Sequence, residues 1–255
     1  MATLASRPGR VVPARGRHGS LAGYGAETPA LRESVTAQDI VDRRPRARGQ
    51  ASVDQYWLPL GAGEGNQCVR GSGRLYEALT AACQHRGRSD LYHSALVVQL
   101  GGDAYAIEMA PVWAVRDPER GVVAEGPVGF PSWGRSRLFR YEVRCWRDGT
   151  IPDLVAAVDS PRRVSADERT AHRVLELVPS FPVFTWGRDE QRTGEMWNSN
   201  SLTAWVLARS GHVTDALRPP ARGRAPGWSA GLVVAAREEV AQQVTHHRHG
   251  GSTAT

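Results

Sequence analysis

A polar stretch at residues 193–202 places residues capable of chemistry at the start of a predicted helix. The apolar residues that follow recur at helical spacing: Leu202, Trp205 and Val206. They predict a helix over 200–209, with Gly211 as its stop signal. Ser199 then lies where backbone N–H groups are unpaired and the helix dipole favours negative charge, a position that suits a nucleophile or a bound anion. Taken alone, however, the stretch is explained more simply if Ser199 or Asn200 only caps the helix.

A histidine and a glutamate belong to two apolar segments that a tight turn joins. Residues 94–100 and 104–110 are rich in aliphatic side chains, and Gly101-Gly102-Asp103 between them predicts a β-hairpin. If Gly101-Gly102 is the turn, residue 95 faces Glu108, and His93 lies diagonally from Glu108 on the same face, with about 7–8 Å between Cα atoms. A turn at Gly102-Asp103 moves them further apart on that face, whereas a three-residue loop separates them. A lone histidine is nevertheless more often a packing residue than a catalyst.

The remaining segments predict a mixed α and β domain. Strands are expected at 121–129 and at 138–146, where alternation puts Tyr141, Val143 and Cys145 on a buried face and charged residues on the other, as in a half-buried strand. Helices are expected at 74–85, 151–158 and 166–177, and no strong strand is expected before residue 61. Residues 179–186 form an irregular aromatic stretch that leads to the helix at 200–209.

Composition is that of a globular protein without a membrane span. The 255 residues are 41% hydrophobic, and no apolar run has the length of a transmembrane helix. The N-terminus lacks the apolar core of a signal peptide, so a cytoplasmic location is the expectation. The three cysteines, Cys68, Cys83 and Cys145, form no Cys-x-x-Cys pair, which argues against a disulfide framework and a structural zinc site.

Basic residues are concentrated at the two ends of the chain. Residues 1–50 hold nine Arg against four acidic residues and 218–255 hold five against two, so the part between them is slightly acidic. We predict a disordered tail at 1–50, one domain at 51–217, and a linker with a weakly ordered tail at 218–255. An acidic folded part argues against specific nucleic-acid binding. The histidines of the tail, His246, His247 and His249, have no ordered neighbours to orient them, so no metal or cofactor is expected.

The order of these motifs resembles the circularly permuted branch of the NlpC papain-like superfamily, which includes the lecithin retinol acyltransferase group. In that branch a histidine opens a strand, a second polar residue follows on the next strand, and the nucleophilic cysteine comes late, at a helix start. The motif Asn-Cys-Glu-His-Phe of the acyltransferases aligns with residues 198–202, and the glycine ending that helix aligns with Gly211. The resemblance covers roughly residues 51–217. It implies an α+β, papain-like fold with a small antiparallel sheet packed against helices.

The resemblance also implies an acyl-transfer or amide/ester hydrolysis site in which serine replaces cysteine. Ser199 would be the nucleophile, His93 the general base and Glu108 the residue that orients the imidazole. The backbone N–H of Ser199, helped by Asn198 or Asn200, would form an oxyanion hole. The tryptophans Trp186, Trp197 and Trp205 would line a pocket for a small-molecule, lipid or peptide substrate, although core packing explains them equally well.

Alternatives remain open at this point. A serine hydroxyl is far less acidic than a thiol, so a site shaped for a thiolate loses activity on this exchange, and a catalytically inactive domain that binds a small ligand or a protein is a serious alternative. Cys68 precedes a helix and His93, which is the unpermuted order, but the helix begins several residues too late for a nucleophile at its start. A weaker idea is nucleic-acid association through the Arg-rich ends, which would depend steeply on salt.

Overall fold

The computed structural model describes residues 50–60, 87, 89–112, 119–151, 154–212, 217–221 and 223–250, with side chains up to residue 245. The chain divides into two units, Met1–Ser34 and Val35–Thr255, and every described residue belongs to the second. The predictions for residues 1–49, for the helix at 74–85, and for Cys68 and Cys83 lie outside the described residues.

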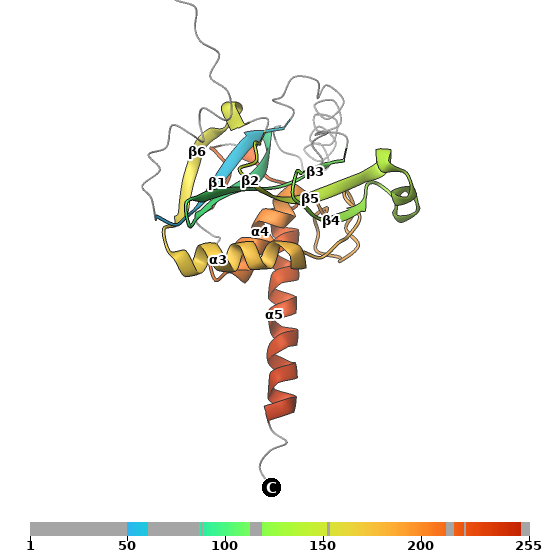
Figure 1. Ribbon diagram of the computed structural model, residues 1–255. Helices are drawn as coiled ribbons and strands as arrows, with labels where there is room; N and C mark the ends of the chain where they lie inside the picture. Colours follow the sequence, from blue (N-terminus) through green and yellow to red (C-terminus); the bar gives the residue numbers. More distant parts are fainter. Residues whose placement is uncertain are drawn as a thin grey trace, which may run out of the picture. The chain divides into compact units, whose positions relative to one another are not determined.

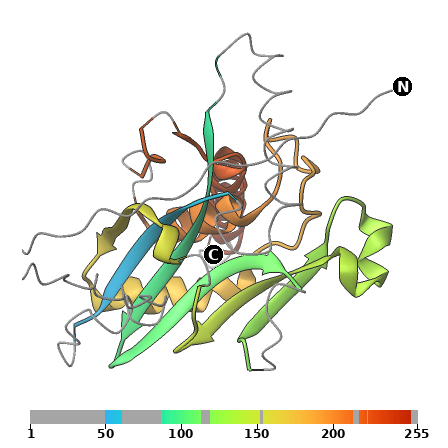
Figure 2. The same ribbon diagram turned by 90° about the horizontal axis from the view of Figure 1, so that it is seen from above.

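The described part of the second unit is an α+β domain, in which helices cover one face of a sheet (Figure 1). Along the sheet the strand order is β4-β5-β3-β2-β1-β6, with each neighbouring pair antiparallel, and β7 pairs with β2 in parallel. The strands are β1 (Ser52–Pro59), β2 (Asp90–Leu100), β3 (Asp103–Pro111), β4 (Val122–Pro127), β5 (Arg140–Arg147), β6 (Val158–Ser165) and β7 (Gly223–Arg224). The α-helices are α3 (Glu168–Leu177), α4 (Ser199–Arg209) and α5 (Trp228–Gly250). Figure 2 looks down onto the sheet. The predicted class, an antiparallel sheet packed against helices, is confirmed.

The β2–β3 hairpin has the predicted register. Leu96 pairs with Ile107 and Leu100 with Asp103, so that Gly101 and Gly102 form the two-residue turn. Both glycines have positive φ angles, +62° and +94°, which side chains with a Cβ rarely adopt. The glycine pair therefore fixes which residues of the two strands share a face.

Two strands differ from the predictions. β1 precedes residue 61, where no strong strand was expected, and is buried along nearly its whole length between β2 and the edge strand β6. β6 occupies the stretch between the two helices predicted at 151–158 and 166–177, where no element is predicted, and the first of these helices is reduced to the short 3-10 helix η3 (Leu154–Ala156). β6 is an edge strand, the position in a sheet that tolerates a proline such as Pro161, and its polar sequence hides the strand pattern.

Both faces of the sheet are covered, which corrects the prediction that β5 is half-buried. Leu96 and Val143 belong to the core between the sheet and the helices, whereas a second apolar cluster on the other face contains Tyr56, Leu58, Ala95, Val97, Ala106, Ile151 and Leu154. Of the charged residues of β5 on that second face, Glu142 and Arg144 are fully buried, whereas Arg140 is partly exposed. Cys145 lies on the helix side, partly buried against the core, and burial raises the pKa of its thiol to about 11.

Within the C-terminal region, the sequence indicates a strand or a short helix at 231–243 that packs back on the domain, and the structure has a longer helix there, α5. The first two turns of α5 pack on α4, where Ala230, Val234 and Ala235 are buried. Gly231 permits the close approach, since a Cβ there would lie 2.3 Å from the carbonyl oxygen of Ser201. From residue 236 onward most positions are exposed, and Figure 1 shows α5 extending past the other helices.

Candidate functional site

The start of α4 is a capped and buried helix end. Asn198 is the N-cap: its side chain accepts a hydrogen bond from the N–H of Asn200 at 2.9 Å, and the Ser201 hydroxyl accepts one from the N–H of Asn198 at 3.1 Å. At the other end, Gly211 has a φ of +86°, and the N–H of His212 donates to the carbonyl of Leu207, as in a Schellman motif. The predicted helix and its stop are therefore confirmed, but the cap is Asn198 and not Ser199 or Asn200.

The two amide side chains of the motif hold other segments in place. Asn200 Nδ2 donates to the carbonyls of Tyr92 and Pro226, both at 2.9 Å, and its Oδ1 accepts from the Ser94 hydroxyl at 2.9 Å. Asn198 Nδ2 donates to the carbonyl of Pro226 at 2.8 Å. These bonds join α4 to β2 and to the loop before α5. They use both N–H donors of the Asn200 amide and one of the two N–H donors of the Asn198 amide.

Ser199 occupies the first position of α4 and is 4% exposed. Among the described residues its hydroxyl has no hydrogen-bond partner. The side chain of β2 that reaches the first turn of α4 is Ser94, through Asn200. The β2 side chain that contacts this turn is therefore a hydroxyl and not a base.

His93 lies on the opposite face of the sheet, which corrects the expectation that it meets Ser199. The pairing of β1 with β2 is regular, with Leu58 opposite His93 and Trp57 opposite Ser94. Successive side chains of a strand point to opposite faces. Since Ser94 contacts α4, His93 points away from it, into the cluster that contains Leu58. Desolvation lowers the pKa of His93 from 6.5 to about 4, so the imidazole is neutral at pH 7.

Glu108 shares a face with His93, as the hairpin register predicts, but its carboxylate is committed elsewhere. Glu108 is 8% exposed and forms an ion pair with Arg144 at 2.8 Å. Arg144 also binds Glu142, which in turn binds Arg120, so that four charged side chains form one network. Desolvation opposes ionisation of Glu142, but hydrogen bonds from Arg120 and Arg144 outweigh it and lower the pKa of this carboxyl. Glu108 therefore balances the charge of Arg144 instead of orienting an imidazole as expected. The sequence signal for this role is the pair of opposite charges on the neighbouring strands β3 and β5.

The three tryptophans belong mainly to the aromatic core. Trp197 stacks on Phe181 at 4.9 Å between ring centroids, and Trp205 meets the same ring edge-on at 5.6 Å. Trp205 Nε1 donates to Glu238 of α5 at 3.0 Å. Trp186 packs edge-on against Tyr141 at 5.7 Å and is partly exposed. Core packing therefore accounts for these side chains.

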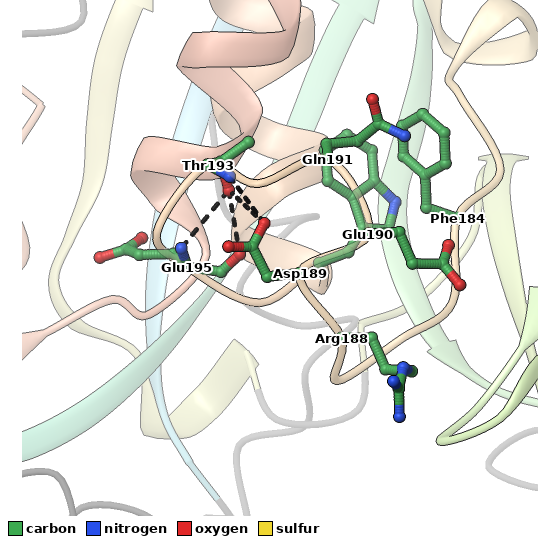
Figure 3. Close-up of a pocket in the computed structure, with 8 residues that line it drawn as sticks. Phe184, Arg188, Asp189, Glu190, Gln191, Thr193 and Glu195 are labelled. Carbon is green, nitrogen blue, oxygen red and sulfur yellow. Dashed lines mark hydrogen bonds between the residues drawn. The ribbon is translucent and has the colours of Figure 1, made fainter.

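A shallow depression does lie beside Trp197, lined by the loop at 184–195 (Figure 3). Its polar side chains bind the protein itself. Asp189 accepts hydrogen bonds from Thr193 and from the N–H of Gly194, which lower its pKa although desolvation opposes this. Glu195 accepts from the N–H groups of Gly227 and Ser229 at the start of α5. The acidic side chains that line the depression therefore stabilise the fold, and few polar groups there remain to bind a ligand.

Sequence reasoning missed an exposed apolar surface between β4 and β5. We call residues 128–139 the aromatic tip; it contains the 3-10 helices η1 (Pro131–Arg135) and η2 (Arg137–Phe139). Its large apolar side chains are exposed to the following extents: Phe130 47%, Trp133 47%, Leu138 70% and Phe139 41%. The sequence carries a signal for this surface, namely four bulky apolar residues and two Arg within ten positions, but the predicted strands at 121–129 and 138–146 cover only the two ends of the tip and no element is predicted for 130–137.

The described residues hold no metal-binding cluster and no membrane-spanning helix. They contain no group of three or more His, Cys, Asp or Glu side chains arranged to hold a metal, and no helix among them is long and apolar enough to cross a membrane. The side chains of His246, His247 and His249 lie outside the described residues, as does Cys68. Comparison of the chain with known protein families, with curated proteins and with solved structures finds no match.

Proposed function

We propose that this chain is a binding domain without catalytic turnover, built on a permuted papain-like plan. The plan is supported by the antiparallel sheet, the late helix that begins after Asn198, and the strand order in which a histidine and an acid precede it. The absence of turnover is the alternative that the sequence left open, and the geometry around Ser199 favours it over acyl transfer or hydrolysis.

The observation that carries the proposal is the side chain of β2 that contacts α4. A serine attacks a carbonyl only when a neighbouring base removes its proton. The residue of β2 on the α4 side is Ser94, which donates to Asn200, and the imidazole one residue earlier belongs to the other face. A shift of one residue in a strand moves a side chain across the sheet, so small adjustments do not restore a Ser–His pair.

The surface available for binding is the aromatic tip. Monomeric proteins rarely expose several bulky apolar side chains in one patch unless the patch contacts a partner. The Asn200 amide at the start of α4 and the Asp189 carboxylate in the loop at 184–195 form hydrogen bonds within the fold, whereas Phe130, Trp133 and Leu138 are exposed to solvent. We therefore assign recognition to the tip rather than to the region of Ser199.

The catalytic question is tested with a fluorophosphonate probe, which labels activated serines. The full chain, Ser199→Ala and the control Ser180→Ala, which removes an exposed serine, are compared with heat-denatured protein, and turnover of p-nitrophenyl acetate and decanoate is measured in parallel. We expect no labelling or turnover above the denatured background. Labelling that disappears in Ser199→Ala and in His93→Ala, but persists in Ser180→Ala, would overturn the proposal.

A further inference from the structure

We infer that the aromatic tip docks on the surface of an anionic lipid bilayer. The inference rests on the proposed function, since it names the partner of that binding domain. In both views the tip lies at the outer end of β4 and β5, away from α3, α4 and α5 (Figures 1 and 2). It is therefore placed to meet a flat surface before the rest of the sheet does.

The tip presents apolar side chains in a fixed arrangement. Phe130 and Trp133 pack with ring centroids 4.8 Å apart, and Trp133 and Phe139 with centroids 4.9 Å apart. The backbone holds them there: Trp133 N donates to the carbonyl of Phe130 at 3.0 Å, and Val128 N to that of Phe139 at 2.8 Å. Leu138, the most exposed of the four, extends the patch. Trp, Phe and Leu are the side chains that bury themselves at the boundary between headgroups and acyl chains.

The charge of the tip complements an anionic surface. Residues 128–139 contain Arg135 and Arg137 and no acidic residue. Both Arg side chains are exposed, and neither has an ion-pair partner among the described residues. At the base of the tip, Arg188 lies 5.0 Å from the centre of the Phe130 ring. Each Arg near anionic headgroups strengthens binding, in addition to the burial of the apolar side chains.

The arrangement fits a bilayer better than a nucleic acid or a peptide. Bases stack on open aromatic faces, but here the rings of Phe130, Trp133 and Phe139 pack on one another and Arg188 covers Phe130. A peptide needs a groove for its side chains, and the depression beside Trp197 is lined by none of these four apolar residues. Insertion between lipids needs only a projecting apolar surface with basic residues beside it.

The test is co-sedimentation of the full chain with vesicles of phosphatidylglycerol and phosphatidylcholine at 1:1, and of phosphatidylcholine alone. We expect binding to the anionic vesicles at least about tenfold stronger than to the neutral ones. Trp133→Ser with Leu138→Ser should weaken it by about tenfold or more. Arg135→Gln with Arg137→Gln should weaken it by about 30-fold, since two interfacial charges are lost.

Matched controls remove the same groups elsewhere on the surface. Val183→Ser with Val240→Ser removes exposed apolar side chains, and Arg169→Gln with Arg173→Gln removes two exposed charges from α3. Both controls should bind within about twofold of the unmodified chain. Vesicle binding of the single variant Leu138→Ser is measured as well, because a substitution at a 70% exposed position leaves the fold intact if the double variant does not fold.

No binding to anionic vesicles, or binding that the tip and control variants weaken equally, would overturn the inference. Binding that depends on Trp133 but goes to a single-stranded oligonucleotide or an acidic peptide instead of vesicles would also overturn it, while the proposal of a binding domain stands. Probe labelling that depends on both Ser199 and His93, by contrast, would overturn the proposed function whether or not vesicles bind.

Discussion

Replacing Asn200 separates a structural role of the α4 start from a catalytic one. In the structure the buried amide makes three side-chain hydrogen bonds: from the Ser94 hydroxyl, and to the carbonyls of Tyr92 and Pro226, each at 2.9 Å. A net contribution of about 1 kcal/mol for each gives a loss of about 3 kcal/mol in the free energy of unfolding for Asn200→Ala. That is a large part of the stability of a typical domain.

The neighbouring substitutions sharpen this prediction. Ser199→Ala removes a hydroxyl without a hydrogen-bond partner among the described residues, so it should change the free energy of unfolding by no more than about 0.5 kcal/mol. Asn200→Asp keeps the shape but turns an acceptor toward two carbonyls, and should cost more than Asn200→Ala. At an exposed helix start, the dipole would instead make Asp favourable by about 0.3–1 kcal/mol.

The assay is urea unfolding followed by circular dichroism, with all variants measured at one pH. The urea concentration at the midpoint of unfolding should fall strongly in both Asn200 variants and should not change in Ser199→Ala. The slope of the unfolding free energy against urea concentration should be the same in all variants. Unchanged stability of Asn200→Ala, or stabilisation by Asn200→Asp, would refute the assignment of this side chain to the fold. It would return Asn200 to the list of candidate ligand contacts.

The remaining predictions concern the charge network and the crossing of α4 and α5. Glu142→Gln removes the carboxylate between two Arg side chains and should cost about 3–5 kcal/mol in urea unfolding at pH 7. Because the folded pKa of Glu142 lies below its usual 4.5, the stability that this carboxylate contributes is present above pH 4.5 and is lost as the pH falls through the folded pKa. The free energy of unfolding of Glu142→Gln should therefore fall less steeply with decreasing pH than that of the unmodified chain. An equally steep fall would contradict the role of the network. Gly231→Ala should lower the melting temperature through a clash of about 1–3 kcal/mol with the Ser201 carbonyl, although alanine favours helix; a rise would show that the crossing is looser than described.

Much of the local structure could be predicted from the sequence because turn and cap residues act locally. Gly101 and Gly102 permit the type of turn that sets the register of β2 and β3, and Gly211 marks the end of α4, whose cap, Asn198, immediately precedes the predicted Ser199 or Asn200. These signals identified the face shared by His93 and Glu108 correctly. They are fixed by the conformations open to a few adjacent residues.

The relation between distant segments could not be predicted in the same way. Nothing local to His93 tells which face of β2 receives α4; that follows from where Ser94 and Asn200 meet, more than a hundred residues apart. Burial of Arg144 and Glu142 likewise depends on partners from other strands, so alternation alone suggested an exposed face. β6 escaped prediction because an edge strand needs no apolar pattern and accepts Pro161.

The measurement that tests the central claim most directly is the pKa of His93 by NMR, with its resonance identified among the eight histidines by the variant His93→Gln. The imidazole lies away from α4, and desolvation alone lowers its pKa, so we predict a value of about 4 that neither Glu108→Gln nor Ser199→Ala changes. A pKa at or above 6.5 that falls in Glu108→Gln would show an imidazole paired with that carboxylate. If it also moved in Ser199→Ala, the three side chains would share one site, and the account of a non-catalytic domain would be contradicted.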